Sequence, residues 1–259
     1  MRAVVWNMSY WQKSETERAS AWDWLHASGA DIALLQEAVP PHGLRSVVYE
    51  PIGGSRPWGS AVIGFTLDLD PVTAVHGRAN TRPVELARSH PGTVAVATFE
   101  RGGRLITAGS LYGLIDKGYA DSTVHRQLSD LSPLLDDPKL GKHLLLGGDL
   151  NITTQWIGRH ARYRTWEAAT FARIAALGLQ DCFDKHRSAG PLDGCGCADG
   201  AGCRHIRTQY HAASTRPWQN DYVFATGPLF KLNSAARVVD DATTRQLSSH
   251  LPLVLDFDL

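Results

Sequence analysis

The sequence predicts an α+β fold in which two β-sheets pack face to face and helices lie outside them. Three observations carry this prediction. Short apolar runs of strand type recur from the first residues to the last. Stretches with the apolar spacing of helices separate some of these runs. The 259 residues, 43% of them hydrophobic and 20% charged, can bury one large core, so we expect a single domain over residues 1–259.

The predicted elements follow one another in a regular order. Apolar runs of strand type lie at residues 3–6, 32–36, 59–65, 94–99 and 105–108. Residues 15–27 form a helix-like stretch between the first two of these runs. An amphipathic helix is expected over residues 121–135, because apolar side chains recur there near helical spacing at Val124, Leu128, Leu131 and Leu135. Residues 173–177 belong to another short helix.

Residues 144–151, Leu-Leu-Leu-Gly-Gly-Asp-Leu-Asn, are the most informative stretch of the chain. The uncharged apolar run predicts a buried strand, and the paired glycines mark a sharp turn or a close approach of the backbone to another group. Asp149 and Asn151 are two residues apart, so in an extended segment both side chains point to the same side. Such a pair can accept a proton from a water molecule and orient it, which suits hydrolysis better than packing.

Polar residues close other apolar runs in the same way, at Asn7, Glu37, Tyr112, Asp221 and His250. Two packed sheets can bring such strand ends from distant parts of the sequence into one cleft. A phosphodiester is anionic and resists attack by water. The usual remedy is a hard divalent cation held by carboxylate and amide oxygens, which Glu37 and Asn7 supply.

The order of these motifs resembles that of the endonuclease/exonuclease/phosphatase superfamily, which includes pancreatic deoxyribonuclease and exonuclease III-type abasic-site endonucleases. The most specific parts are Gln36-Glu37, residues 147–151 and residues 249–252, and the resemblance covers nearly the whole chain. It implies a four-layered α/β sandwich of two mostly antiparallel sheets with helices outside. It also implies a phosphodiesterase that depends on Mg²⁺ or Mn²⁺ and hydrolyses nucleic acid, as an endonuclease or an exonuclease.

The resemblance further implies a role for each residue near the scissile bond. Glu37 would be the main metal ligand, with Asn7 assisting it. Asp149 would orient or deprotonate the attacking water, and Asn151 would contact the phosphate.

The remaining roles concern the phosphate oxygens and the leaving group. His250 would contact the phosphate, held in one tautomer by Asp221, as a carboxylate commonly fixes a histidine. Tyr112 would sit beside the leaving group or the phosphate. Most relatives carry Asp immediately before this histidine, whereas this chain has Ser249, whose neutral hydroxyl is a poorer ligand for a hard dication. We therefore expect an active enzyme with one catalytic metal; a degenerate, non-catalytic binding relative is the alternative.

Each candidate also has a plainer explanation. The carboxylates could be solvated strand ends, the asparagines turn residues, the histidine a surface residue and the tyrosine an aromatic at the edge of the core. Their occurrence together, in this order, favours function.

A glycine-rich insert at about residues 190–206 holds three of the four cysteines. Cys195, Cys197 and Cys203, with His205, can give zinc three thiolates and an imidazole, and the site would be structural because no position is left for water. A disulfide or reduced thiols in a mobile loop are the alternatives. Cys182 is expected to be part of the core. The insert leads into residues 207–211 and could therefore form a rigid wall of the active cleft.

Residues 156–166 mix arginines with aromatic residues, which suits a nucleic-acid strand, either DNA or RNA. The hypothesis is that Arg159, Arg162 and Arg164 contact substrate phosphates. Trp166, at the expected start of a helix, is instead predicted to help close the core.

The global composition limits the partners. The 26 basic and 26 acidic residues leave a formal net charge of zero, so any affinity for nucleic acid has to come from a local patch. This neutrality favours a second reading, a phosphatase or phosphodiesterase acting on a small phosphorylated molecule. No run is long or apolar enough for a membrane span, and no signal-peptide pattern is present, so we expect a cytoplasmic chain without membrane contact, and a monomer.

Overall fold

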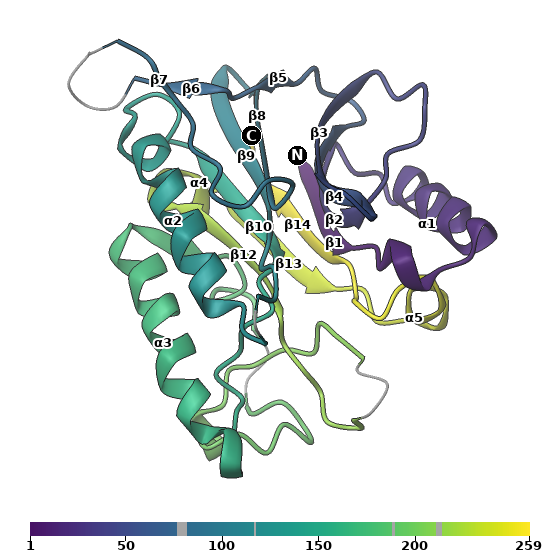
Figure 1. Cartoon of the computed structure of the whole chain (residues 1–259), viewed down its shortest axis with the longest axis vertical. Coiled ribbons are helices and arrows are strands. Elements are labelled where there is room, and N and C mark those ends of the chain that lie inside the picture. The colour runs from purple at the N-terminus through teal and green to yellow at the C-terminus, as the bar shows by residue number, and fades with distance from the viewer. Residues whose placement is uncertain (77–81, 117, 188–189, 211–213) are drawn as a thin grey trace.

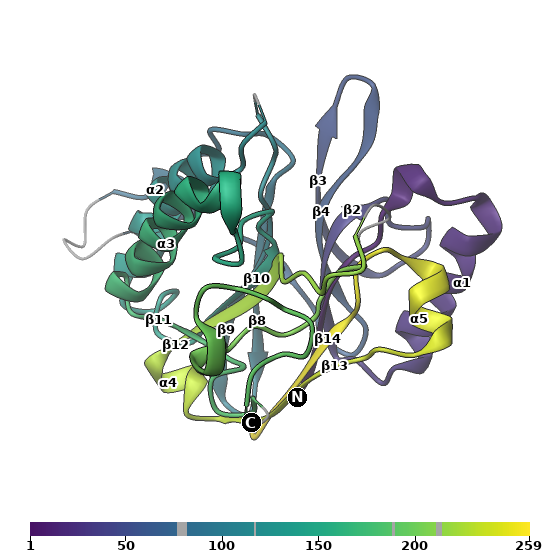
Figure 2. The same ribbon diagram turned by 90° about the horizontal axis from the view of Figure 1, so that it is seen from below.

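The computed structural model describes residues 1–76, 82–116, 118–187, 190–210 and 214–259. Within these ranges two six-stranded sheets pack face to face. Helices α2 and α3 cover the outer face of one sheet, and α1 and α5 lie outside the other (Figures 1 and 2). The four layers confirm the predicted sandwich.

The first sheet joins the beginning of the chain to its last strand. Its strand order is β13 (Asn233–Val238), β14 (Leu253–Phe257), β1 (Arg2–Asn7), β2 (Ile32–Ala38), β4 (Arg56–Gly64) and β3 (Ser46–Gly53). Only β1 and β2 run parallel among the described pairs of this sheet.

The second sheet likewise combines antiparallel pairs of strands with one parallel pair among its described strands. Its order is β11 (Leu179–Asp181), β12 (Asp221–Thr226), β10 (Leu144–Asp149), β9 (Arg104–Tyr112), β8 (Val94–Arg101) and β5 (Asp70–Pro71). The β9–β10 pair is parallel and its other described pairs are antiparallel. The short strands β6 (Ala74–Val75) and β7 (Val84–Glu85) pair with each other. Both large sheets are therefore mixed but mostly antiparallel.

The helices predicted at residues 15–27 and 121–135 are present at nearly those bounds, and the structure adds others. The described helices are α1 (Glu15–Ala27), α2 (Asp121–Asp136), α3 (Ala161–Ala176), α4 (Gly227–Phe230) and α5 (Ala242–Leu247), with 3₁₀ turns η1 (Tyr10–Gln12), η2 (Gly158–His160) and η3 (Gly200–Gly202). Helix α1 starts after Ser14, which forms a reciprocal capping box with Glu17. The short helix predicted at residues 173–177 is the last part of the longer α3. Among the described residues, no helix has the length and apolar character that crossing a bilayer requires.

Alternation along the central strands divides the core. Val5 of β1 packs between the sheets with Leu34, Leu145 and Val223, whereas its neighbour Trp6 faces the layer that contains α1. This period of two is what a strand buried on both faces requires.

Gly147 shows why glycines interrupt the apolar run of β10. A Cβ atom at Gly147 would lie 2.9 Å from a methyl group of Val5 in the facing sheet. The prediction that the paired glycines mark a close approach is confirmed here.

Two predictions about apolar side chains have different outcomes. Cys182 is fully buried in the core between the sheets, as predicted. The prediction that Trp166 helps close the core is wrong: it lies within α3 and is 51% exposed, with its ring against Tyr163. The helix starts earlier than expected, at Ala161, and Trp166 is on its solvent-facing side.

Candidate active site

The polar residues that close the apolar runs meet at one edge of the packed sheets. Strand pairing aligns three of them, because Asp149 lies opposite Tyr112 of β9 on one side and opposite Asp221 of β12 on the other. Asn7 and Glu37 come from β1 and β2 of the facing sheet. Hydrogen bonds then join the two sheets through these side chains.

Asp149 lies at the centre of this cluster and is only 1% exposed. Its Oδ2 accepts hydrogen bonds from Asn7 Nδ2 and Asn151 Nδ2, both at 2.9 Å. Its Oδ1 accepts from the backbone N–H of Asn151, also at 2.9 Å. Asn151 has a φ of 51°, in the left-handed region. The predicted convergence with Asp149 therefore occurs, but a tight turn produces it and the extended backbone assumed from the sequence does not.

Glu37 turns into the cleft at an irregularity of β2. Its φ is 45°, and the register with β4 shifts between Leu35 and Ala38. Its Oε1 accepts from Tyr112 Oη at 3.0 Å and from Asn7 Nδ2 at 3.3 Å. Burial, with the nearby Glu37 and Asp149 charges, raises the pKa of Tyr112 far above its usual range, so the phenol stays protonated.

Asn7 presents its amide nitrogen, and not its oxygen, to the two carboxylates. Its Oδ1 accepts a hydrogen bond from the backbone N–H of Ser9 at 2.9 Å, which fixes the orientation of the amide. In this arrangement Asn7 positions Glu37 and Asp149. Its predicted role as an oxygen ligand would require the amide to turn round.

His250 lies between two carboxylates. Its Nδ1 is 2.9 and 3.0 Å from the oxygens of Asp221, and its Nε2 is 3.9 Å from Asp149 Oδ2. Gln209 Nε2 also faces His250 Nε2 at 3.0 Å, while its Oε1 accepts from Asn220 Nδ2 at 2.6 Å. The donor on Gln209 favours an unprotonated Nε2 and therefore a neutral ring.

The carboxylates oppose that preference and outweigh it. Burial lowers the pKa of His250, but the charges of Asp221 and Asp149 more than offset this and raise the pKa to about 9. Burial also raises the pKa of Asp149 to about 7; Asp221 and Glu37 add to this increase, and His250 opposes it. We take His250 as charged, because two carboxylates in a buried site act on it more strongly than one neutral amide does.

The donor set fits a hard divalent cation. Three carboxylates, from Glu37, Asp149 and Asp221, face one imidazole in a buried site, which leaves negative charge for a cation to neutralise. Ligand atoms of Asp149, Asp221 and His250 lie within 4.8 Å of one another. Ser249 stands where the resemblance implies a carboxylate. Its hydroxyl oxygen lies 3.0 Å from Ser9 Oγ.

A cleft of about 520 Å³ opens over this cluster. Sequence reasoning missed several residues that line it, among them Arg56, Trp58 and Gln209. Arg56 and Trp58 start β4, directly after the turn at Gly53 and Gly54, and the Trp58 ring meets Tyr112 edge-on at 5.5 Å. A glycine pair followed by a basic and an aromatic residue is the sequence pattern that could have indicated this part of the cleft. Gln209 belongs to residues 207–211, which follow the insert and of which residue 211 is outside the described residues. None of the described residues of the insert itself lines this cleft, so the prediction that the insert forms its wall is wrong.

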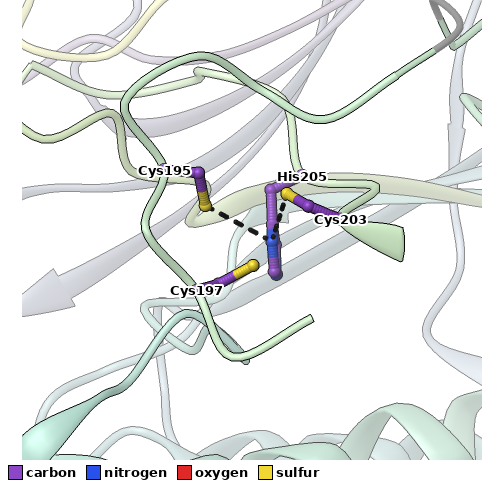
Figure 3. Close-up of side chains that lie close together, drawn as sticks. All are labelled: Cys195, Cys197, Cys203 and His205. Carbon is purple, nitrogen blue, oxygen red and sulfur yellow. Dashed lines mark hydrogen bonds between the residues drawn. The ribbon is translucent and has the colours of Figure 1, made fainter. Parts of the chain in front are cut away.

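The three arginines predicted to contact substrate are not among the residues that line this cleft. Arg159 and Arg162 are exposed at η2 and the start of α3, and Arg162 lies over the ring of Tyr163. Arg164 forms an ion pair with Asp199 of the cysteine-rich insert. The four predicted zinc ligands, in contrast, come together in a second cluster (Figure 3).

A buried carboxylate–histidine cluster thus lies where the edges of the two packed sheets meet. The model of the Endonuclease/Exonuclease/phosphatase family matches residues 6–248, and the chain belongs to this family, whose members hydrolyse phosphoester bonds.

Solved structures share the fold. An AP endonuclease from Archaeoglobus fulgidus is 18% identical with a TM-score of 0.64, and the alignment covers 100% of both chains. The 3' phosphatase NExo from Neisseria, bound to product DNA hairpin, is 18% identical with a TM-score of 0.66 and the same coverage. The endonuclease domain of TRAS1, a telomere-specific non-LTR retrotransposon, is 20% identical with a TM-score of 0.63, covering 100% of this chain and 98% of that one. No match was found among curated protein sequences.

Proposed function

We propose that this chain is a divalent-metal-dependent phosphodiesterase that cleaves nucleic acid. The observation that carries the proposal is the cluster in an open cleft of Glu37 and Asp149, which Asn7 joins by hydrogen bonds, with His250, which Asp221 holds from behind. Solved structures with the same fold include an AP endonuclease and a phosphatase bound to DNA, which supports nucleic acid as the substrate class.

A bound Mg²⁺ or Mn²⁺, held by Glu37, would neutralise phosphate charge and stabilise the leaving oxygen. The chain's own residues prepare the attack. Asn7 and Asn151 fix the Asp149 carboxylate in one orientation. Asp149 Oδ1 receives one hydrogen bond from Asn151, which leaves acceptor capacity to orient a water molecule and take its proton.

His250 and Tyr112 act on the phosphate and the leaving group in this proposal. Asp221 holds Nδ1 of His250, so Nε2 is the atom directed toward the cleft and can contact a phosphate oxygen. Tyr112 remains a neutral donor because of its burial, and its hydroxyl can be shared between Glu37 and the leaving oxygen. Asn151 lines the cleft, and to contact the phosphate its amide would exchange the hydrogen bond that it donates to the carbonyl oxygen of Gly113.

Basic and aromatic residues around the cleft are proposed to bind the strand. Arg56 and Trp58 line the cleft itself. The exposed Arg159 and Arg162 extend the basic surface along η2 and α3, and Arg164 would have to exchange its ion pair with Asp199 for a phosphate. A small phosphorylated molecule is the second candidate substrate, favoured by the formal net charge of zero.

The test is cleavage of labelled single- and double-stranded DNA and RNA with Mg²⁺, Mn²⁺ or chelator. We expect metal-dependent cutting that Asp149→Ala abolishes and Asp23→Asn, an exposed carboxylate on α1, leaves intact. Cleavage of small phosphate esters alone would transfer the proposal to the second substrate class. No hydrolysis of either class would refute it and favour a non-catalytic binding relative.

The arginine hypothesis has its own experiment. Replacing Arg159, Arg162 and Arg164 together by alanine should weaken nucleic-acid binding and reduce its salt dependence, because fewer counterions are released. Unchanged affinity over a range of salt concentrations would reject these residues as phosphate contacts.

A further inference from the structure

A second cluster of ligating side chains lies outside the cleft, in the insert between β11 and β12. Ligand atoms of Cys195, Cys197, Cys203 and His205 all lie within 4.8 Å of one another. Figure 3 shows the three sulfur atoms and the imidazole directed toward a common centre. All four cysteines of the chain are free, so no disulfide explains the grouping.

Two nitrogen–sulfur distances in the cluster agree with a tetrahedral zinc site. Zinc–sulfur bonds of about 2.3 Å and zinc–nitrogen bonds of about 2.0 Å, at tetrahedral angles, place a sulfur and a nitrogen ligand about 3.5 Å apart. His205 Nδ1 is 3.4 Å from Cys203 Sγ and 3.7 Å from Cys195 Sγ. Cys195 and Cys203 are buried, as expected of ligands enclosed by the protein.

Hydrogen bonds outside the cluster orient two of the four ligands. His205 Nε2 is 2.8 Å from Thr154 Oγ1, which leaves Nδ1 directed at the sulfur atoms. Gln155 Nε2 donates to Cys195 Sγ at 3.1 Å. The orientation of that amide is fixed, because Gln155 Oε1 accepts from the backbone N–H of Gln219 at 2.7 Å. Contacts outside the cluster therefore hold His205 and Cys195 in their orientations.

The backbone of the insert is suited to curl around an ion. Gly194 and Gly196 flank Cys195 with φ values of 69° and 59°, in the left-handed region that other residues rarely adopt. Arg216 donates from Nε to the carbonyl oxygen of Cys195 and from Nη2 to that of Gln155. Three thiolates would carry more negative charge than one dication neutralises. The positive charge of Arg216 lies beside this site.

The cluster connects the insert to the active-site segments. Thr154 and Gln155 lie shortly after Asp149 and Asn151 in the chain, and Gln219 precedes Asp221 by two residues. From His205 the chain continues to Gln209, which faces His250. The four ligands themselves all lie in the insert, so the hydrogen bonds of His205 to Thr154 and of Gln155 to Cys195 and Gln219 are what join it to these segments.

We propose that Cys195, Cys197, Cys203 and His205 bind one structural Zn²⁺ that fixes the fold of the insert and so holds in place its hydrogen bonds to Thr154 and Gln155 of the segment after β10. The site has four protein ligands and no position for water, so the ion takes no part in hydrolysis. This proposal does not depend on the activity of the cleft.

The test is the metal content of the full chain, purified with reductant and without chelator or a polyhistidine tag. We expect about one zinc ion per chain. Cys197→Ser should lose it, and because Cys197 is the least buried of the three cysteine ligands this variant disturbs packing least. Two controls should keep the zinc: Cys182→Ala, which removes the core thiol, and Asp149→Ala, which removes a carboxylate of the cleft.

A second measurement uses Co²⁺ in the chelator-treated chain. Tetrahedral thiolate coordination should give sulfur-to-cobalt charge-transfer absorption in the wild type and none in Cys197→Ser. A folded wild-type chain with neither zinc nor this absorption would overturn the proposal. Full zinc content in Cys197→Ser would overturn it as well, and loss of zinc in Asp149→Ala would place the ion in the cleft instead.

Discussion

Replacing Asp221 by asparagine isolates the charge that faces His250. The side chain keeps its size and one oxygen, but the carboxylate that lies 2.9 Å from Nδ1 becomes neutral. The pKa of His250, which the carboxylates raise to about 9, should therefore fall. The direction follows from charge alone, since the amide cannot stabilise an imidazolium as a carboxylate does.

The size of the effect follows from the separation. Two unit charges at 2.9 Å attract each other by about 6 kcal/mol at an effective dielectric constant of about 20. That energy corresponds to about 4 pH units and is an upper limit, because the asparagine oxygen can still accept the hydrogen bond and Asp149 remains nearby. We expect a fall of about 2 pH units or more. Loss of a charge-assisted hydrogen bond should also reduce kcat/KM by about 10- to 150-fold.

The assay is an NMR titration of the histidine ring signals without divalent metal, in which comparison with His250→Gln identifies the signal of His250. Gln209→Ala serves as a control of opposite sign. It removes the donor that favours the neutral ring, so the pKa of His250 should rise. An Asp221→Asn protein with the wild-type pKa and with kcat/KM within about twofold of the wild type would refute the pairing inferred here.

Three further predictions concern stability and binding. Burial raises the pKa of Glu167 from 4.5 to about 7, so the folded chain keeps a proton that the unfolded chain loses. The stability that this group contributes is therefore present below pH 4.5 and is lost as the pH rises to about 7, by on the order of 2 kcal/mol. Urea unfolding of Glu167→Gln should lack this decline. An equal decline in the variant would exclude Glu167 as its source. Gly147→Ala should lower the free energy of unfolding by about 1–3 kcal/mol, because the new methyl group meets Val5. Gly202→Ala, with open space around the new methyl group, should change this free energy little. Similar values for both variants would contradict the close packing of the sheets. Arg56→Ala should weaken nucleic-acid binding and lower the salt slope by about 1, and an unaltered slope would remove it from the phosphate contacts.

Local signals in the sequence predicted α1 and α2 well, but only the last part of α3 and neither α4 nor α5. The bounds of α1 agree with the predicted residues 15–27, because Ser14 and Glu17 form a capping box that depends on neighbours in the chain. Helix α2 similarly follows from its apolar spacing. The pairing of β1 with β14 could not be predicted from periodicity, since it joins residues about 250 positions apart. The resemblance implied the layers of the sandwich but not this pairing of strands.

For the candidate site too, the sequence indicated which residues meet but not how their side chains are oriented. The polar strand ends of both sheets meet, as their place after apolar runs indicated. Their orientations depend on contacts between distant segments. Asn7 turns its nitrogen inward because Ser9 holds its oxygen, and Asn151 converges on Asp149 through a left-handed turn. Gln209 beside His250 had no local signal at all.

The position of β14 in the first sheet sets the order in which the protein can become functional during synthesis. Strand β14 lies between β13 and β1, and His250 immediately precedes it. Strands β1 and β2 leave the ribosome early, but β1 lacks its second neighbour until residues 253–257 have been made. All three acidic side chains of the cleft, Glu37, Asp149 and Asp221, are therefore made before the histidine that they surround. A nascent chain should lack the complete cluster until His250 and β14 have been added to it.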